Sequence, residues 1–85
     1  MPWQIFFTHE AEKNLKKLSS HIVERVKDAS REIASNPVSA GKHLKGDLKG
    51  FFSFRIGDYR IVYTIEKQHS KIYILYIRHR RESYK

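Results

Sequence analysis

The ten residues FRIGDYRIVY, Phe54–Tyr63, predict a β-hairpin and its register. Apolar and polar residues alternate on both sides of Gly57-Asp58, and a glycine in the first central place suits a two-residue type II′ turn. This loop length puts Arg55 directly opposite Arg60. Like charges in opposite positions repel, so the two arginines are either a tolerated surface pair or a site for a negatively charged group.

The alternation divides the hairpin side chains between two faces of a sheet. We expect one face to pack against helices, and it carries Phe52, Phe54, Ile56, Ile61 and Tyr63. We expect the other face to be open, and it carries Ser53, Arg55, Arg60, Val62 and Thr64. A phosphate between the two guanidinium groups would replace their repulsion with charge-assisted hydrogen bonds. Side chains that splay apart and touch nothing are the alternative.

The residues before the hairpin predict one strand and two helices. Trp3–Phe7 is short, apolar and aromatic, which is typical of a strand. Thr8 is a suitable N-cap for a first helix, and the serines at 19 and 20 separate it from a second helix that ends at Ser35–Pro37. Apolar residues at helical spacing mark the buried stripes of the two helices: Ala11, Leu15, Leu18, Ile22, Val26, Ala29 and Ile33.

Two further segments complete the predicted fold. Residues 37–50 show no periodicity, which indicates either a plain connector or a functional loop. The stretch KIYILYIR, residues 71–78, is apolar on both faces, as in a central strand covered on both sides. The order βααβββ predicts an α+β fold in which a helical hairpin packs on one face of a mostly antiparallel, four-stranded sheet. We expect residues 1–85 to form a single domain.

Charge and composition narrow the function. The net charge is +8, and residues 41–85 carry +7 of it, which favours a polyanionic partner over a merely solubilising surface. There is no cysteine, so a disulfide framework and a cysteine zinc site are excluded. No apolar run is long enough for a signal peptide or a membrane span, and we expect a soluble, cytoplasmic protein with no membrane contact.

The C-terminal stretch IRHRRESYK adds cations and an aromatic ring. Arg78, His79, Arg80 and Arg81 can neutralise phosphates, and Tyr84 offers a stacking face for an unpaired base. A solvated chain end is the alternative. Phosphate-binding loops and the common hydrolase motifs are absent from the sequence.

Taken together, LKGDLKGFFSFRIGDYRIVYTI and IYILYIRHRRESY resemble the RelE branch of the RelE/ParE toxin superfamily, over nearly the whole chain. The resemblance implies a toxin of a type II toxin–antitoxin pair that cleaves messenger RNA in the ribosomal A site without a metal or other cofactor. It also implies a RelB-like antitoxin that wraps and inhibits the toxin in a hetero-oligomer.

The resemblance also implies roles for individual residues. Arg60 falls on a family arginine that contacts the scissile phosphate, Arg80 on one that protonates the leaving group and stabilises charge, and Tyr84 on a tyrosine that stacks on a base. Arg55 matches a basic strand position. Phe51 and Ser53 stand where well-studied members carry two lysines, one of them the proposed general base.

The resulting assignment names two groups of residues. Candidate bases in place of the missing lysines are Lys49, Lys45 and His79. The expected catalytic set is Arg55, Arg60, Arg80, Tyr84 and Lys49, and the expected RNA-binding set is Lys45, Arg78, His79 and Arg81. The resemblance implies attack of a 2′-OH on the neighbouring phosphate, which we expect to be catalysed mainly by positive charge. A ParE-like inhibitor of DNA gyrase and a non-catalytic protein that binds antitoxin or RNA are the alternatives.

Overall fold

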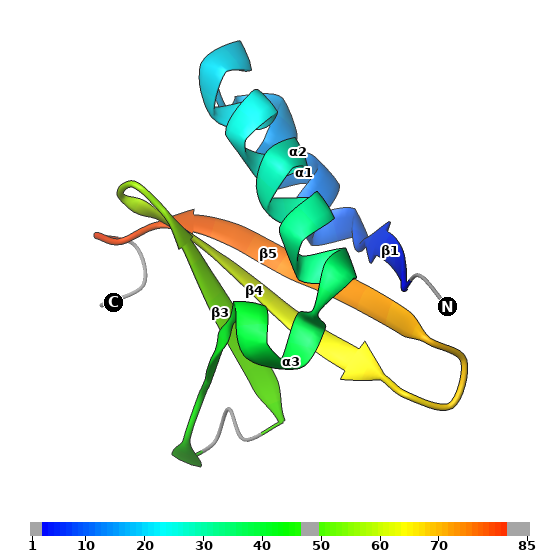
Figure 1. The fold of residues 1–85 in the computed structure, drawn as a ribbon. Coiled ribbons are helices and arrows are strands. Elements are labelled where there is room, and N and C mark those ends of the chain that lie inside the picture. The colour runs from blue at the N-terminus through cyan, green and yellow to red at the C-terminus, as the bar shows by residue number, and fades with distance from the viewer. Residues whose placement is uncertain (1–2, 47–49, 82–85) are drawn as a thin grey trace.

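The structure is a computed structural model that describes residues 3–46 and 50–81, and it contains one sheet with helices packed on it (Figure 1). In the described part of the chain the elements are, in order, β1 (Gln4–Phe7), α1 (His9–Lys17), α2 (Ser20–Ser35), α3 (Pro37–Ala40), β2 (Lys42–His43), β3 (Phe51–Ile56), β4 (Tyr59–Glu66) and β5 (Lys71–His79). None of the helices among these residues is long and apolar enough to cross a membrane.

The α+β class is confirmed, but the predicted strand count is wrong. The sheet has five strands in the order β1-β5-β4-β3-β2, with β1 parallel to β5 and the other neighbours antiparallel. The additional strand, β2, and the single turn of α3 both lie within the segment that was predicted to lack structure. A strand of two residues is too short to show alternation, and one helical turn is too short to show a stripe.

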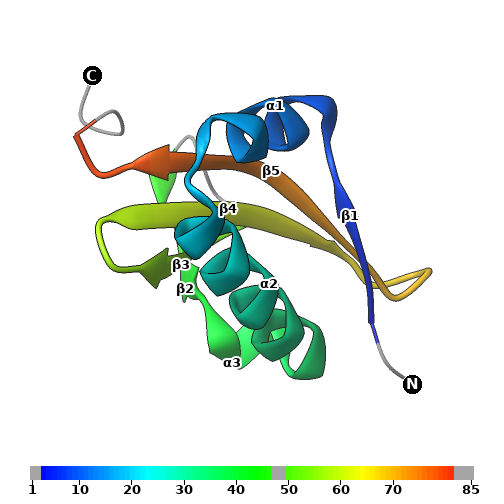
Figure 2. The same ribbon diagram turned by 90° about the horizontal axis from the view of Figure 1, so that it is seen from above.

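Both long helices begin where the sequence predicted. The side chain of Thr8 accepts a hydrogen bond from Ala11 N–H, and that of Ser19 accepts one from Ile22 N–H. The helices then cover one face of the sheet, α1 over β5 and α2 across β3 and β1 (Figure 2). Their buried residues form one core with the strands: Ala11, Val26, Ala29, Ile33, Phe52, Ile56, Ile61, Tyr63, Ile72, Ile74 and Ile77.

Helix α1 also supplies hydrogen bonds to the part of β5 that runs beyond β1. Thr8 Oγ1 donates to the carbonyl oxygen of Leu75 at 2.8 Å, and Asn14 Oδ1 accepts from Ile77 N–H at 2.8 Å. Unpaired backbone groups at a sheet edge are costly when water is excluded. The two polar side chains of the helix therefore replace the missing neighbouring strand.

The hairpin has the predicted register, with Arg55 opposite Arg60 across a two-residue turn. Gly57 has a φ of +61°, and Asp58 does not share the positive φ, as a type II′ turn requires. The prediction of an open second face needs correction, because Ser53 and Val62 are buried there. They lie opposite each other in the middle of the sheet face, whereas the arginines lie near its end.

The predicted burial of β5 on both faces is also wrong. Ile72, Ile74 and Ile77 are buried against the helices, but Tyr73 and Tyr76 are only half-buried. The pattern was apolar on both faces because tyrosine rings occupy the face away from the helices. Tyrosine combines an apolar ring with a polar hydroxyl, so it is suited to a partly solvent-exposed position.

A close contact between Tyr63, α3 and Gly41 holds the start of β2 against the sheet. The buried Tyr63 hydroxyl donates to Pro37 O at 2.7 Å. A Cβ atom on Gly41 would collide with this hydroxyl and lie 3.0 Å from Ser53 O, so only glycine fits. Burial raises the pKa of Tyr63 to about 12, although the backbone of Gly41 acts in the opposite direction.

We expect Tyr63→Phe to lower the free energy of unfolding by about 1–3 kcal/mol at neutral pH, since it leaves the Pro37 carbonyl without its donor. The wild-type advantage should be constant below about pH 10, where Tyr63 is protonated in both the folded and unfolded states. It should shrink between about pH 10 and the folded pKa of about 12, because the unfolded phenol ionises first. Urea titrations of both proteins across this range test the account, and a difference that stays flat would contradict it.

Candidate functional site

The sheet aligns three arginines on the face away from the helices. Arg55 on β3 lies opposite Arg60 on β4, and Arg60 lies opposite Arg78 on β5. We call Arg55, Arg60 and Arg78 the arginine row. Paired positions on neighbouring strands have Cβ atoms about 5 Å apart. The row therefore concentrates three positive charges at one end of the sheet, one more than the hairpin alone predicted.

A β-bulge in β5 brings Arg78 into the row. Val62 pairs with Tyr76 but Tyr63 pairs with Ile74, so Leu75 has no partner in the register. Without this extra residue the β4–β5 register would slip by one, and Arg78 would change faces. The bulged residue is also the one whose carbonyl accepts the hydrogen bond from Thr8, so the N-cap residue of α1 holds the bulge in place.

Arg80 lies beside the row because the chain folds back on the hairpin turn. Its backbone N–H donates to Asp58 O at 2.7 Å. Arg80, Arg55 and Arg60 line one shallow surface pocket of about 30 Å³, together with residues 57–59 of the turn. This volume is close to that of a single water molecule. A pocket of this size does not hold a whole small molecule, so these cations favour a single anionic group such as one phosphate of a polymer.

The arginine row is not neutralised within the described residues 3–46 and 50–81. The ion pairs found there join side chains of α2 to each other and Glu66 to His69, and none includes a member of the row. Arg78 is held by an aromatic ring instead, with its guanidinium carbon 4.3 Å from the centre of the Tyr76 ring. The row is thus a cationic surface available to an anion.

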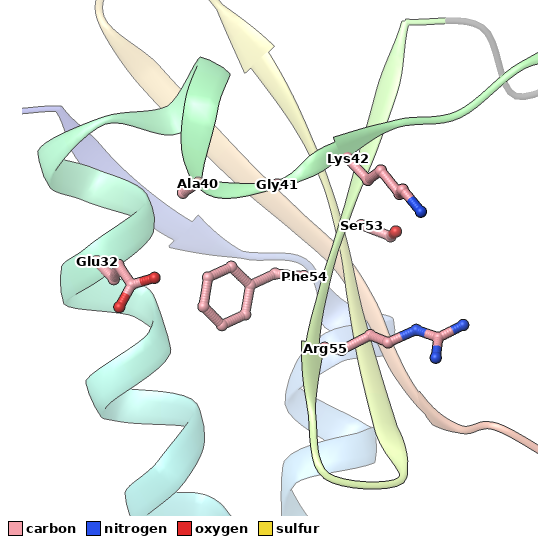
Figure 3. Close-up of a pocket in the computed structure, with 7 residues that line it drawn as sticks. All are labelled: Glu32, Ala40, Gly41, Lys42, Ser53, Phe54 and Arg55. Carbon is pink, nitrogen blue, oxygen red and sulfur yellow. The ribbon is translucent and has the colours of Figure 1, made fainter.

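Lys42 adds an amine to this face, and sequence reasoning did not find it. Lys42 on β2 pairs with Ser53 on β3. Figure 3 shows its side chain on the same side of the sheet as those of Ser53 and Arg55. Only the unpredicted strand β2 brings Lys42 to this place, and no signal in the sequence marks a strand of two residues.

A larger cavity lies elsewhere, between α2 and the outer edge of β3. Its volume is about 610 Å³, and Phe54 and Glu32 face it (Figure 3). Arg55 and Lys42 are at its rim and point toward the opposite side of the sheet. The cavity combines one ring with one carboxylate and does not bring the predicted site residues together.

The remaining predicted residues are placed differently. His79 lies on the helix side, where its ring packs edge to face on Tyr59 at 5.2 Å, and its Nδ1 accepts from Arg81 N–H. Lys45 and Arg81 are exposed, in the segments that follow β2 and β5. Lys49 and Tyr84 lie outside the described residues. The structure thus gathers Arg55, Arg60, Arg78 and Arg80, and leaves the ring of His79 on the other face.

Residues 5–84 match the family model described as "ParE toxin of type II toxin-antitoxin system, parDE". The chain belongs to this toxin family. Toxin RelG of Mycobacterium tuberculosis is 36% identical over 86 residues, covering 100% of this chain and 99% of RelG. Toxin RelE of the same organism is 35% identical, covering 99% of this chain and 88% of RelE.

A solved structure agrees with these relatives of the toxin. The toxin–antitoxin complex RelBE2 from M. tuberculosis contains a chain that superposes with a TM-score of 0.87 at 34% identity, covering 93% of this chain and 99% of that one. The predicted resemblance to RelE/ParE toxins is therefore confirmed, and so is the general fold. The chain is a type II toxin of this family.

Proposed function

We propose that this toxin is a ribosome-dependent endoribonuclease that cuts messenger RNA and so stops translation in the cytoplasm. The arginine row, with Arg80 beside it, carries the proposal. Cleavage by a neighbouring 2′-OH adds negative charge to the phosphate in the transition state, and preorganised cations stabilise that charge. The similarity to proteins named RelG and RelE supports the same choice.

In the proposed reaction the 2′-oxygen bonds to phosphorus, and the bond from phosphorus to the 5′-oxygen breaks. The products are a 2′,3′-cyclic phosphate and a 5′-OH, which takes up a proton. Arg60 contacts the phosphate from the centre of the row, and Arg55 and Arg80, which line the same small pocket, add further cationic donors. Tyr84 stacks on a substrate base.

The proton of the 2′-OH needs a separate acceptor, because arginine stays charged at any ordinary pH. Lys45, Lys49 and His79 are the acceptors expected from the sequence. The ring of His79 is on the helix side, which removes it from direct reach of the row. Lys42 lies next to Ser53, so we propose that its amine occupies the region where the family carries strand lysines.

Gyrase inhibition is the second candidate, since the matching family model is described as ParE. A translation extract supplied with purified protein separates the two. We expect cleaved message while translation proceeds, little cleavage of the same message without ribosomes, and unimpaired gyrase supercoiling. Intact message with blocked supercoiling would show that the toxin inhibits gyrase. Intact message with normal supercoiling would indicate a non-catalytic protein that binds antitoxin or RNA.

We further propose that an antitoxin covers the arginine row with an acidic segment and so holds the toxin inactive in a hetero-oligomer. The partners in RelBE2 support an antitoxin as such, and the concentrated charge supports its acidic character.

Exchanging both Arg55 and Arg60 for glutamate is expected to weaken antitoxin binding by at least about 100-fold, because attraction becomes repulsion at the centre of the interface. Titration calorimetry with the co-expressed antitoxin, repeated at two salt concentrations, measures the change. The matched control exchanges Lys27 and Arg31 on the outer surface of α2 for glutamate, with the same change in net charge. Equal losses in both proteins, or binding that salt does not affect, would refute the proposed contact.

A further inference from the structure

Phe6 is a large apolar side chain on the sheet face away from the helices. Its side chain is 42% exposed, whereas its neighbours Ile5 and Phe7 turn to the other face and pack against the core. Phe6 pairs with Tyr73 in the sheet, and their rings stack with centroids 5.7 Å apart and planes 27° apart. Lys71 Nζ lies 5.5 Å from the centre of the Phe6 ring. An aromatic pair with a cation over the Phe6 ring therefore stands outside the core.

The rings of β5 connect this surface to the arginine row. From Tyr73 the strand passes the bulge to Tyr76, whose ring lies against Arg78, a member of the row. Residues three apart in a regular strand would lie on opposite faces. Because the bulge adds one residue between them, Tyr73 and Tyr76 both lie on the face away from the helices. The path from residue 73 to residue 78 is on the order of 15 Å at the usual rise of a strand. We call Phe6, Tyr73 and Tyr76 the aromatic track.

The charges along the track favour a nucleic acid. The five described strands contain a single acidic residue, Glu66, which lies opposite Lys71 in the sheet and has its Oε1 2.7 Å from His69 Nδ1. Lys71 stands at one end of the track and Arg78 at the other. Successive aromatic rings beside cations are the arrangement on which unpaired bases stack while their phosphates are neutralised.

We propose that the aromatic track binds the single-stranded RNA that flanks the cleavage site, with bases on Phe6 and Tyr73 and a phosphate near Lys71. The proposal rests on the proposed function, in which the scissile phosphate lies on the arginine row. It extends the substrate contact from one nucleotide to a segment several nucleotides long. The same ribosome-bound message would then be held by both ends of one sheet face.

The test compares short and long RNA. Fluorescence anisotropy measures binding of a tetranucleotide and a dodecanucleotide, both 2′-O-methylated so that no 2′-OH can attack. Phe6→Thr keeps strand propensity and removes the ring. We expect it to weaken dodecanucleotide binding by at least about fivefold, because a lost base stack costs about 1–3 kcal/mol. Tetranucleotide binding should stay within about twofold, since the arginine row holds it alone.

Two further variants sharpen the comparison. Val38 on α3 is the other large apolar side chain found exposed among the described residues, at 48%, and Val38→Thr is the matched control that should bind both RNAs normally. Lys71→Gln keeps the ring and removes the cation, so it should reduce the salt dependence of dodecanucleotide binding by about one phosphate contact. Thermal melts of all variants confirm that they are folded.

Unchanged dodecanucleotide binding in folded Phe6→Thr would overturn the proposal. So would normal RNA binding combined with weaker antitoxin binding, which would assign the surface to a protein. Failure of the proposed function can be told apart from failure of this inference. RNA binding that depends on Phe6, together with a translated message that stays intact, would support the aromatic track and refute cleavage. Cleavage lost in Arg60→Ala, with RNA binding independent of Phe6, would keep cleavage and refute the track.

Discussion

Replacing Arg60 by alanine is expected to abolish growth inhibition and leave the thermal melt of the toxin unchanged. Arg60 occupies the centre of the arginine row, between Arg55 and Arg78, on the face away from the helices. Removing a group that stabilises transition-state charge typically costs on the order of 3 kcal/mol, which is about 100-fold or more in rate. Growth curves after induced expression, alongside melts of the purified protein, measure both effects.

Arg80→Ala should have the same effect on growth. The backbone N–H of Arg80 makes the hydrogen bond to Asp58, so alanine at this position retains that contact while the guanidinium is lost. Arg31→Ala is the matched control, because Arg31 is an exposed arginine on α2 that forms an ion pair with Asp28, on the opposite side of the sheet from the arginine row. Full toxicity of Arg60→Ala, at wild-type expression, would show that the row has no catalytic role.

Replacing Ile61 by alanine should have the opposite effect, with loss of stability first and of toxicity only as a consequence. Ile61 follows Arg60 directly but is 0% exposed, on the helix side of the same strand. Truncating a buried isoleucine costs about 2–5 kcal/mol, and in a domain this small the Tm should fall on the order of 10 °C or more. Calorimetric or circular-dichroism melts measure the shift.

The control for Ile61→Ala is Val38→Ala, which shortens an exposed residue on α3 and should leave the Tm nearly unchanged. Phe54, which the sequence also places on the helix side, is a weaker probe of the core than Ile61. It is on the core side as predicted, but it is only partly buried and lines the cavity beside α2. A wild-type Tm for Ile61→Ala would contradict the assignment of the two faces.

Local rules were sufficient for most of the fold. The register of the β3–β4 hairpin follows from a two-residue loop with glycine in the first place, and the predicted pairing of Arg55 with Arg60 is present. The helix starts follow from Thr8 and Ser19, whose side chains accept the first free backbone N–H groups. These features depend on residues that are close in sequence, so a single sequence can predict them.

Features that depend on distant contacts could not be predicted in this way. Strand β2 exists because Lys42 and His43 meet β3, and Gly41 passes over the buried hydroxyl of Tyr63. The bulge at Leu75 is held by Thr8, 67 residues earlier in the chain, and it sets the face on which Arg78 lies. The sequence identified Arg55, Arg60 and Arg78 as candidate residues. Their alignment in one row depends on the pairing of three strands and on the bulge, which the sequence does not predict.

Primer extension on a message undergoing translation tests the central claim most directly, when wild-type toxin and Arg60→Ala are compared at equal concentration. We predict discrete cuts by the wild-type protein, with 5′-OH ends downstream and cyclic or 3′-phosphate ends upstream, and at least about 100-fold slower cutting by Arg60→Ala. Equal cutting by the two proteins, or no cutting by the wild type while growth is still inhibited, would contradict the account.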